Sequence, residues 1–424
     1  MTRKSLLLPL LLVLGVALLS ACGSAEKPLA VGPARPFPQH VTYPGQQTRP
    51  AVEQARLDAD ALSYYREWKR RYLKPAGQDD KGRPLYRIIH SLEKPDETVS
   101  EGMGYGMVIV AYMAGADPEA RALFDGLFRY AQAHPSDVDG RLMGWIQPPD
   151  GNGNNSAFDG DADIAYSLLL ADRQWGSSGG IDYAAAARER LRAIAESTIG
   201  PASKLPMLGD WVSPAGAAED DYRYSEFTPR LSDFMPAHFR AFGAFTGDAL
   251  WGKVEAATRS AVSGIEERYS PNTGLMPDFA RPQQETGFPL KPVEPNFLEG
   301  PHDGDYEYNA GRYPWRASTA VLLYDDAFWD ERMAKLSHWA ERASGGDPAG
   351  LNAGYHLDGR PIEGQDYFTT FFAAPLATAA MTQPDQQTWL DALYEAIRDR
   401  HEDYYEDSVT LLNLLLLSNN YWAP

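Results

Sequence analysis

The stretch SEGMGYGMVIVAYMAGADPEARALFDGLFRYAQAH, residues 100–134, contains two kinds of predicted helix in succession. Its first part, residues 102–115, is apolar on most faces and rich in small residues, so we expect it to be enclosed. Its second part, residues 118–134, is amphipathic and charged, as in a helix with one face in water. An enclosed helix beside a half-exposed one is the unit from which the fold is predicted.

Segments of these two kinds alternate six times along the 424 residues. The predicted outer helices are 52–72, 118–134, 182–198, 248–268, 328–344 and 385–401. The predicted inner helices are 102–115, 163–174, 236–246, 311–324, 369–381 and 408–417. The alternation predicts an all-α (α/α)6 barrel, with a ring of six inner helices inside six outer ones. Two separate helical domains are the alternative arrangement.

The N-terminus has the layout of an export signal over residues 1–22, with Arg3 and Lys4 before an apolar run too short to span a membrane stably. The run ends in LSAC, which resembles the lipobox of bacterial lipoproteins and implies that Cys22 receives a lipid. Residues 23–49 contain five prolines and little periodicity, so a flexible linker is expected before a barrel domain at 50–424. We therefore expect an exported lipoprotein of the bacterial cell envelope, in the outer membrane of a Gram-negative cell, with the lipid as its only membrane contact.

The formal net charge of −19 disfavours nucleic acids and anionic polymers as partners. A neutral or cationic ligand fits better. Neither a metal-ligand spacing nor a phosphate-binding loop stands out, so no cofactor or metal is expected, and a monomer is expected. Cys22 is the only cysteine, which excludes an intrachain disulfide.

Acidic, aromatic and glycine residues gather where the predicted inner helices begin. The motifs, in chain order, are SEGMGYG (100–106), DGDAD (159–163), SDFMP (232–236), YEYNAGR (306–312), GQDYF (364–368) and YYEDS (404–408). Helix capping by Asp and Ser explains part of this pattern. It does not explain three acids in five residues, so we predict a functional site at one end of the ring.

Carboxylates and aromatic rings in one groove suit a carbohydrate, since aromatic faces cover sugar rings and carboxylates bind hydroxyls. Glu101 is a candidate proton donor, and the glycines around it would let a sugar ring approach; in the alternative interpretation Glu101 is a first-turn acid and the glycines are packing spacers. The helix dipole lowers a carboxyl pKa, whereas an acid catalyst needs it raised, by burial or by a neighbour such as Asp159. The candidate aromatic platforms, each of which could equally belong to the core, are Trp145, Trp211, Tyr105 and Tyr308.

Four motifs together resemble family 8 of the glycoside hydrolases, inverting endo-β-glycanases on an (α/α)6 barrel. They are SEGMGYG, SAFDGDADIAYSLLLADRQWG (156–176), SPNTGLMPDF (270–279) and YNAGRYPWR (308–316). The resemblance runs from about residue 60 to the end. It implies that Glu101 is the general acid and that Asp159 holds the distorted sugar. It further implies that Tyr308 and Arg312 surround the catalytic water and that Trp145 and Trp211 are subsite positions.

Asn309 departs from the family pattern, because many members have an aspartate there that serves as the general base. An amide is no useful base near neutral pH. A subgroup with asparagine at this position takes its base from the preceding loop, which implies Glu299 here. Asp303, Asp305 and Glu307 remain alternatives, since the sequence does not place the loop.

The resemblance therefore implies an endo-acting β-glycanase that hydrolyses β-1,4 or mixed β-1,3-1,4 glucan with inversion. A chitosanase or xylanase of the same family is the alternative. Two hypotheses of other classes stay open: a noncatalytic glycan-binding protein of the envelope, which Asn309 would permit, and a polysaccharide lyase on the same barrel.

Overall fold

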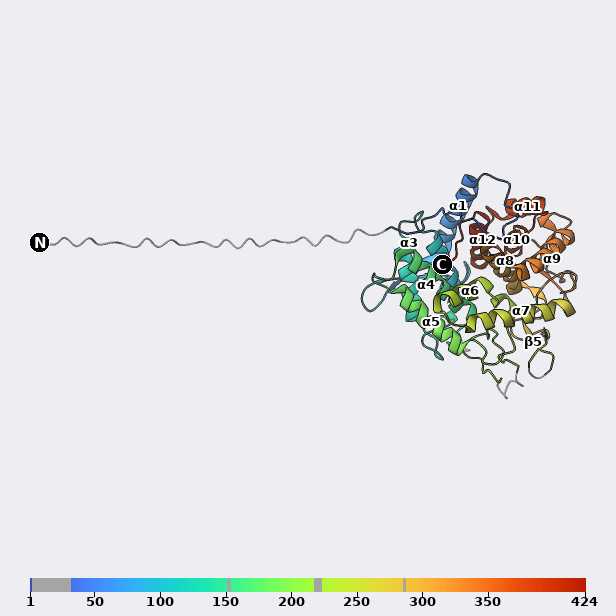
Figure 1. Cartoon of the computed structure of the whole chain (residues 1–424), viewed down its shortest axis with the longest axis horizontal. Coiled ribbons are helices and arrows are strands. Elements are labelled where there is room, and N and C mark those ends of the chain that lie inside the picture. Colours follow the sequence, from blue (N-terminus) through green and yellow to red (C-terminus); the bar gives the residue numbers. More distant parts are fainter. Residues whose placement is uncertain (2–31, 151–153, 217–222, 285–286) are drawn as a thin grey trace. The chain divides into compact units, whose positions relative to one another are not determined.

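The chain folds into a barrel of alternating inner and outer helices, seen in Figure 1. The structure, a computed structural model, describes residue 1 and residues 32–150, 154–216, 223–284 and 287–424. The inner helices are α2 (Ser100–Tyr112), α4 (Phe158–Trp175), α6 (Pro236–Thr246), α8 (Arg312–Tyr324), α10 (Thr370–Ala380) and α12 (Tyr404–Leu417). The outer helices are α1 (Gln54–Tyr72), α3 (Ala120–Ala133), α5 (Tyr183–Ser197), α7 (Leu250–Tyr269), α9 (Ala327–Ala343) and α11 (Gln387–Ile397).

Each inner helix contacts the next inner helix in the chain, and α12 contacts α2, so the ring is closed. All twelve helices belong to one compact unit, residues 33–424. The predicted (α/α)6 barrel is therefore confirmed, and the alternative of two helical domains is excluded.

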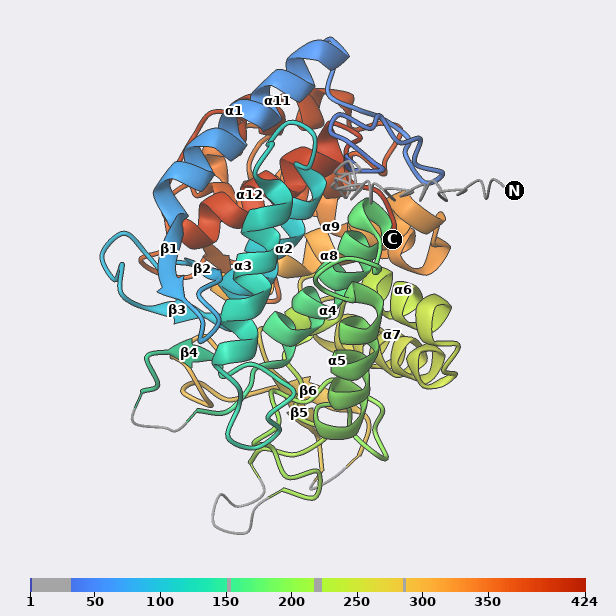
Figure 2. The ribbon, with the colours of Figure 1, turned by 90° about the vertical axis from the view of Figure 1, so that its left-hand side faces the viewer.

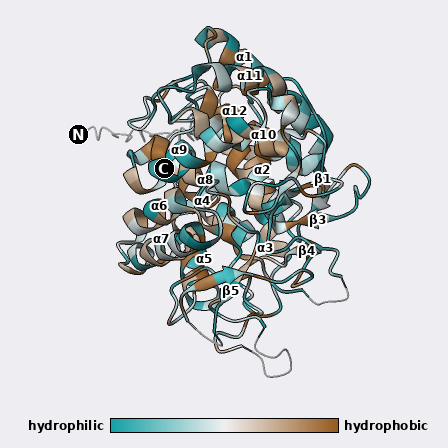
Figure 3. Cartoon of the chain, turned by 90° about the vertical axis from the view of Figure 1, so that its right-hand side faces the viewer, coloured by the Kyte–Doolittle hydropathy of each residue, from teal (hydrophilic) through white to brown (hydrophobic). Residues whose placement is uncertain are grey.

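Burial separates the two kinds of helix as the sequence predicts. Every residue of α10 is buried, and in α2 only Glu101 is not. In α1 the buried positions lie on one stripe spaced by three or four residues, which is the inward face of an amphipathic helix. Hydrophobic residues predominate on α10 and α12 and hydrophilic ones on α1 in Figure 3.

Two inner helices begin four or five residues earlier than predicted. Helix α4 begins at Phe158 rather than at 163, and α12 begins at Tyr404 rather than at 408. Acidic residues are stable in the first turn of a helix, because its N-terminus carries a partial positive charge. Asp159 and Asp161 of DGDAD, and Glu406 and Asp407 of YYEDS, therefore lie inside first turns instead of in preceding loops.

Four short antiparallel strand pairs connect the helices at one end of the barrel. They are β1 (Leu73–Gln78) with β2 (Pro84–Ile88), β3 (Thr98–Val99) with β4 (Ile146–Gln147), β5 (Ala280–Pro282) with β6 (Leu290–Pro292), and β7 (Tyr306–Glu307) with β8 (Gly354–Tyr355). The described residues also form the 3-10 turns η2 (Leu231–Asp233), η3 (Tyr308–Gly311) and η4 (Pro348–Gly350). Figure 2 shows β3–β4 and β5–β6 at the lower end of the helices.

The described part of the predicted flexible linker is packed against the barrel. Phe37 and Tyr43 are buried, at 7% and 3% exposure. The backbone N–H of Phe37 donates to the oxygen of Ala114 (2.7 Å), which follows α2. The N–H of Gln47 likewise donates to Met381 (3.1 Å), which follows α10. Residues 33–49 thus cross the C-terminal ends of the inner helices, because their apolar side chains find a place in the core there, and the expectation of a linker up to residue 49 is corrected.

Two glycines of SEGMGYG, Gly102 and Gly104, lie where inner helices touch, and the third, Gly106, packs against Ile88 of β2. A Cβ on Gly104 would lie 2.6 Å from the Cβ of Asp163 in α4, and one on Gly160 would lie 2.5 Å from the backbone of Ser100 in α2. A Cβ on Gly102 would meet the ring of Tyr404 at 3.0 Å. The expectation that they admit a sugar ring is corrected, because they are packing positions that let α2, α4 and α12 approach closely.

Candidate active site

A cavity of about 660 Å³ opens at the N-terminal ends of the inner helices. Its lining brings together residues from the starts of α2, α4 and α8, from η2, and from the loop before β7. A hollow of about 750 Å³ beside residues 138–141 and 195–214 is larger, but the described residues that line it include no aromatic ring. The smaller cavity holds the predicted acids and is the candidate site.

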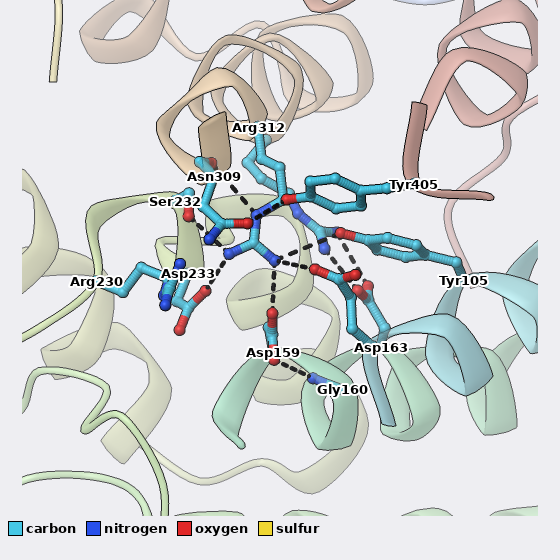
Figure 4. A network of polar contacts seen from close by, with 12 residues as sticks. Tyr105, Asp159, Gly160, Asp163, Arg230, Ser232, Asp233, Asn309, Arg312 and Tyr405 are labelled. Atoms are coloured by element: carbon cyan, nitrogen blue, oxygen red, sulfur yellow. Dashed lines mark hydrogen bonds and ion pairs between the residues drawn. The ribbon is translucent and has the colours of Figure 1, made fainter. Parts of the chain in front are cut away.

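Arg312, the first residue of α8, holds three carboxylates of this cavity together, two of which, Asp159 and Asp233, are labelled in Figure 4. Its guanidinium contacts Glu101 at 3.0 Å, Asp159 at 2.5 Å and Asp233 at 3.1 Å. The side chain is only 1% exposed, and Ser232 accepts a further hydrogen bond from it at 2.8 Å. A buried, permanently charged guanidinium with several donors fixes these carboxylates relative to one another.

Glu101 lies in the first turn of α2 and faces the cavity from a largely buried position, with 17% of its side chain exposed. Burial raises the pKa of Glu101 to about 7. The positive charge of Arg312 opposes this rise, whereas the negative charge of Asp159 adds to it. The hydroxyl of Tyr404, which donates a hydrogen bond to Glu101 at 2.5 Å, also opposes the rise. Burial thus outweighs the helix dipole, and a fraction of Glu101 keeps its proton near neutral pH.

Glu299 faces the same cavity from the loop before β7. Its carboxylate pairs with Arg230 and accepts a hydrogen bond from the amide nitrogen of Asn309 at 3.0 Å. The hydroxyl of Tyr405 donates to the amide oxygen of Asn309 at 2.5 Å, which turns the amide nitrogen toward Glu299. An amide at position 309 therefore supports a carboxylate at position 299, whereas a second carboxylate would repel it.

The other acids of this loop are engaged elsewhere and do not line the cavity. Asp303 is buried and accepts the backbone N–H groups of Leu298, Glu299 and Gly300 at 2.7, 3.0 and 2.8 Å. Asp305 pairs with two histidines, His302 and His356, at 3.1 and 3.0 Å. Glu307 accepts a long hydrogen bond from Gln365 at 3.4 Å. Of the four candidate bases, Glu299 is the one in the cavity wall.

Two of the four predicted aromatic platforms line the cavity. Trp145 is placed by a backbone bond from Ser100 to its carbonyl at 2.8 Å, and the ring of Trp211 packs edge-on against Tyr224 at 5.2 Å. Tyr105 is fully buried beneath Arg312 and next to Trp315, so it supports the guanidinium instead of forming a sugar platform.

Tyr308 also lies outside the cavity lining. Its ring stacks on Phe371, and its hydroxyl donates to Glu406 at 2.8 Å. The expectation of direct substrate contact is therefore corrected for Tyr105 and Tyr308, because the ring of Tyr105 packs between α2 and α8 and that of Tyr308, in η3, packs against α10.

Three residues of the site were not predicted individually from the sequence: Arg230, Asp233 and Tyr404. Asp233 lines the cavity, and burial, together with the charge of Asp159, raises its pKa to about 7 against the pull of Arg312. The motifs SDFMP and YYEDS at the starts of inner helices were the available signal for Asp233 and Tyr404. For Arg230, the signal was a cation two residues before SDFMP.

Within the described ranges, no cluster of three His, Cys, Asp or Glu side chains is arranged to hold a metal ion. No helix of that same part of the chain has the length and apolarity needed to cross a membrane. The predicted signal of residues 1–22 and its Cys22 lie outside the described residues, apart from Met1.

Comparison with known proteins agrees with this geometry. The sequence model of glycosyl hydrolases family 8 matches residues 55–419. A beta-glucanase of Niallia circulans is 38% identical over 396 residues, which cover 92% of each chain. An endoglucanase of Bacillus sp. strain KSM-330 is 36% identical over 403 residues, covering 92% of this chain and 82% of the relative. The apo structure of a beta-1,3-1,4-glucanase from Paenibacillus sp. X4 has a TM-score of 0.86 at 37% identity, covering 93% of this chain and 100% of that one. The chain belongs to family 8 of the glycosyl hydrolases and is a glycoside hydrolase.

Proposed function

We propose that this enzyme hydrolyses β-1,4 or mixed β-1,3-1,4 glucan by endo action and with inversion at the anomeric carbon. The observation that carries the proposal is a buried carboxyl, Glu101, whose pKa is raised to about 7, in one cavity with a second, half-exposed carboxylate, Glu299. Inverting hydrolysis needs this division, with one protonated carboxyl and one carboxylate that activates water.

Glu101 is the proposed general acid. It protonates the glycosidic oxygen as the bond to the anomeric carbon breaks, and its raised pKa makes the proton available near neutral pH. Arg312 then stabilises the carboxylate that remains, because its guanidinium already lies 3.0 Å from Glu101.

Glu299 is the proposed general base. It removes a proton from the water that attacks the opposite face of the sugar ring. Asp159, held at 2.5 Å from Arg312, is proposed to bind the sugar in its distorted form at the cleavage point. Each group faces the cavity, so all three can reach one sugar ring.

The substrate class is supported by the cavity wall and by the relatives. Trp145 and Trp211 offer rings that can cover the apolar faces of sugar rings. The relatives at 36–38% identity carry the names beta-glucanase, endoglucanase and beta-1,3-1,4-glucanase. A neutral glucan is therefore the first substrate to test, and chitosan and xylan are the second.

Substitution of the two carboxyls tests the mechanism. Glu101→Gln and Glu299→Gln should each lower kcat on soluble mixed-linkage glucan by about two orders of magnitude or more, with KM little changed, because an amide neither donates nor accepts the required proton. Asp305→Asn removes a rejected base candidate from the same loop and should keep nearly the whole of kcat. Normal turnover by Glu101→Gln or Glu299→Gln would refute the assigned role.

The stereochemistry of the first product, followed by proton NMR, tests inversion. A β-linked glucan should release the α-anomer at its new reducing end before mutarotation. Release of the β-anomer would mean that a carboxylate attacks the sugar. Hydrolysis of chitosan or xylan in preference to both glucans would reassign the substrate, and binding without cleavage would support a glycan-binding protein.

We propose in addition that the protein is exported and anchored through a lipid on Cys22. The support is the sequence of residues 1–22, in which a charged start and an apolar run precede LSAC.

A further inference from the structure

Arg230 is fixed in the cavity wall, directly before η2. Its guanidinium centre lies 4.3 Å from the ring centre of Phe279. One terminal nitrogen donates to both oxygens of Asp278, at 3.2 and 3.1 Å, and the other pairs with Glu299. Only 12% of the side chain is exposed. A planar guanidinium held on a ring and a carboxylate has little freedom to move.

Glu299, by contrast, has few restraints of its own. Its side chain is 47% exposed, and its carboxylate is held by Arg230 on one oxygen and by Asn309 on the other. Asp303 fixes only the backbone, through the N–H groups of residues 298–300. The direction of the Glu299 side chain is therefore set by Arg230 and Asn309.

We propose that Arg230 is a positioning residue, which holds the Glu299 carboxylate turned toward the cavity. The proposal rests on the role of Glu299 as the base. A half-exposed glutamate on a loop would otherwise sample several rotamers. Any rotamer that turns the carboxylate away from the attacking water lowers turnover.

Several charged groups surround the guanidinium of Arg230. They are Asp278, Glu299, Asp233 and Arg312. Burial raises the pKa of Asp278 well above its usual value, although Arg230 opposes this, and the charge of Glu299 raises it further. Asp278 is buried and Glu299 is half-exposed, so Arg230 joins a buried acid on one side to Glu299 on the cavity side.

Two substitutions separate the charge of Arg230 from its shape. Arg230→Gln removes the charge and the fork; it should lower kcat at least about tenfold with KM nearly unchanged, because the Glu299 carboxylate is then free to turn away from the attacking water. Arg230→Lys keeps the charge without the two-sided fork, so its kcat should lie between those of the wild type and Arg230→Gln, again with KM nearly unchanged.

Arg281→Gln is the matched control, since Arg281 on β5 pairs with Glu294 at 2.7 Å and does not line the cavity. It should behave as the wild type. A wild-type kcat in Arg230→Gln, or a loss of activity that lies wholly in KM, would overturn the proposal. If Arg230→Gln does not fold, Arg230→Lys decides: a wild-type kcat overturns it.

The outcome is separable from that of the proposed function. Full activity of Glu299→Gln would show that the base is wrong. An inactive Glu299→Gln beside an unaffected Arg230→Gln would leave the base in place and remove only the role of Arg230.

Discussion

At the scale of single residues, the site depends on how one carboxyl keeps its proton at the start of a helix. The helix N-terminus favours the ionised form of Glu101, but burial has the larger effect on its pKa. The loss of hydration destabilises the carboxylate more than the helix dipole stabilises it. Two neighbours adjust the result in opposite directions: Asp159 raises the pKa of Glu101 and Tyr404 lowers it.

Substitution of Asp159 or of Tyr404 should shift the alkaline limb of the pH–activity profile, in opposite directions. Asp159→Asn removes a negative charge, so Glu101 should lose its proton at lower pH and the limb should move down. Tyr404→Phe removes a hydrogen bond to the ionised form, so the limb should move up. Each shift should be about half a unit to one unit in kcat/KM against pH on a soluble glucan.

The alkaline limb of the wild type should lie near pH 7, where Glu101 titrates. Shifts of the same sign in both variants would contradict this account of Glu101. The far-UV circular dichroism of each variant serves as the control for folding.

At the scale of elements, the site depends on close contact between inner helices. Helices α2 and α4 approach so closely at Gly104 and Gly160 that no Cβ fits at either position. This contact brings Glu101, in the first turn of α2, and Asp159, in the first turn of α4, to one guanidinium. A wider helix spacing would separate the two acids.

Gly104→Ala should therefore destabilise the protein by about 1–3 kcal/mol, because the clash with Asp163 exceeds the gain in helix propensity. Gly264→Ala in outer helix α7 is the matched control, since its Cβ would meet nothing within 4 Å. That variant should gain about 0.5–1 kcal/mol from propensity alone. Urea unfolding at pH 6 measures both, and equal free energies for the two variants would refute the packing argument.

At the scale of the whole molecule, closure of the ring joins groups that are far apart in the chain. Arg312 and Glu101 are 211 positions apart, and Tyr404 and Glu101 are 303 apart. The segment 33–49 crosses the other end of the barrel, where inner helices such as α2 and α10 finish. The cavity and this segment thus lie at opposite ends of the inner helices.

We expect the proposed lipid anchor on Cys22 and the catalytic site to act independently. With the proposed anchor, Cys22→Ser should move the enzyme from the membrane fraction to the soluble fraction, because acyl chains on Cys22 would supply the attachment. Its kcat/KM on soluble glucan should equal that of the wild type, since residues 33–424 form one compact unit without the signal. Retention of Cys22→Ser in the membrane fraction would contradict the anchor.

Much of the fold could be predicted because the local pattern of apolar and polar residues indicates which helices are buried. Apolar runs such as 369–381 and amphipathic ones such as 118–134 differ in composition, and their alternation indicates an inner and an outer ring. The ends of the helices were less predictable, because acids in a first turn resemble acids in a loop. The linker prediction failed from residue 33 onward, because proline content does not reveal that Phe37 and Tyr43 find a place in the core.

The sequence by itself determined the barrel, the family resemblance and the acids of the helix starts. Tertiary structure decided which acids act together: Glu299 lines the cavity, whereas Asp303 binds its own loop. It also decided that Tyr105 is buried and that Arg230 holds Glu299. The physical reason is that periodicity reports how deeply a residue is buried, whereas the direction and protonation of a side chain depend on charges brought beside it from distant parts of the chain.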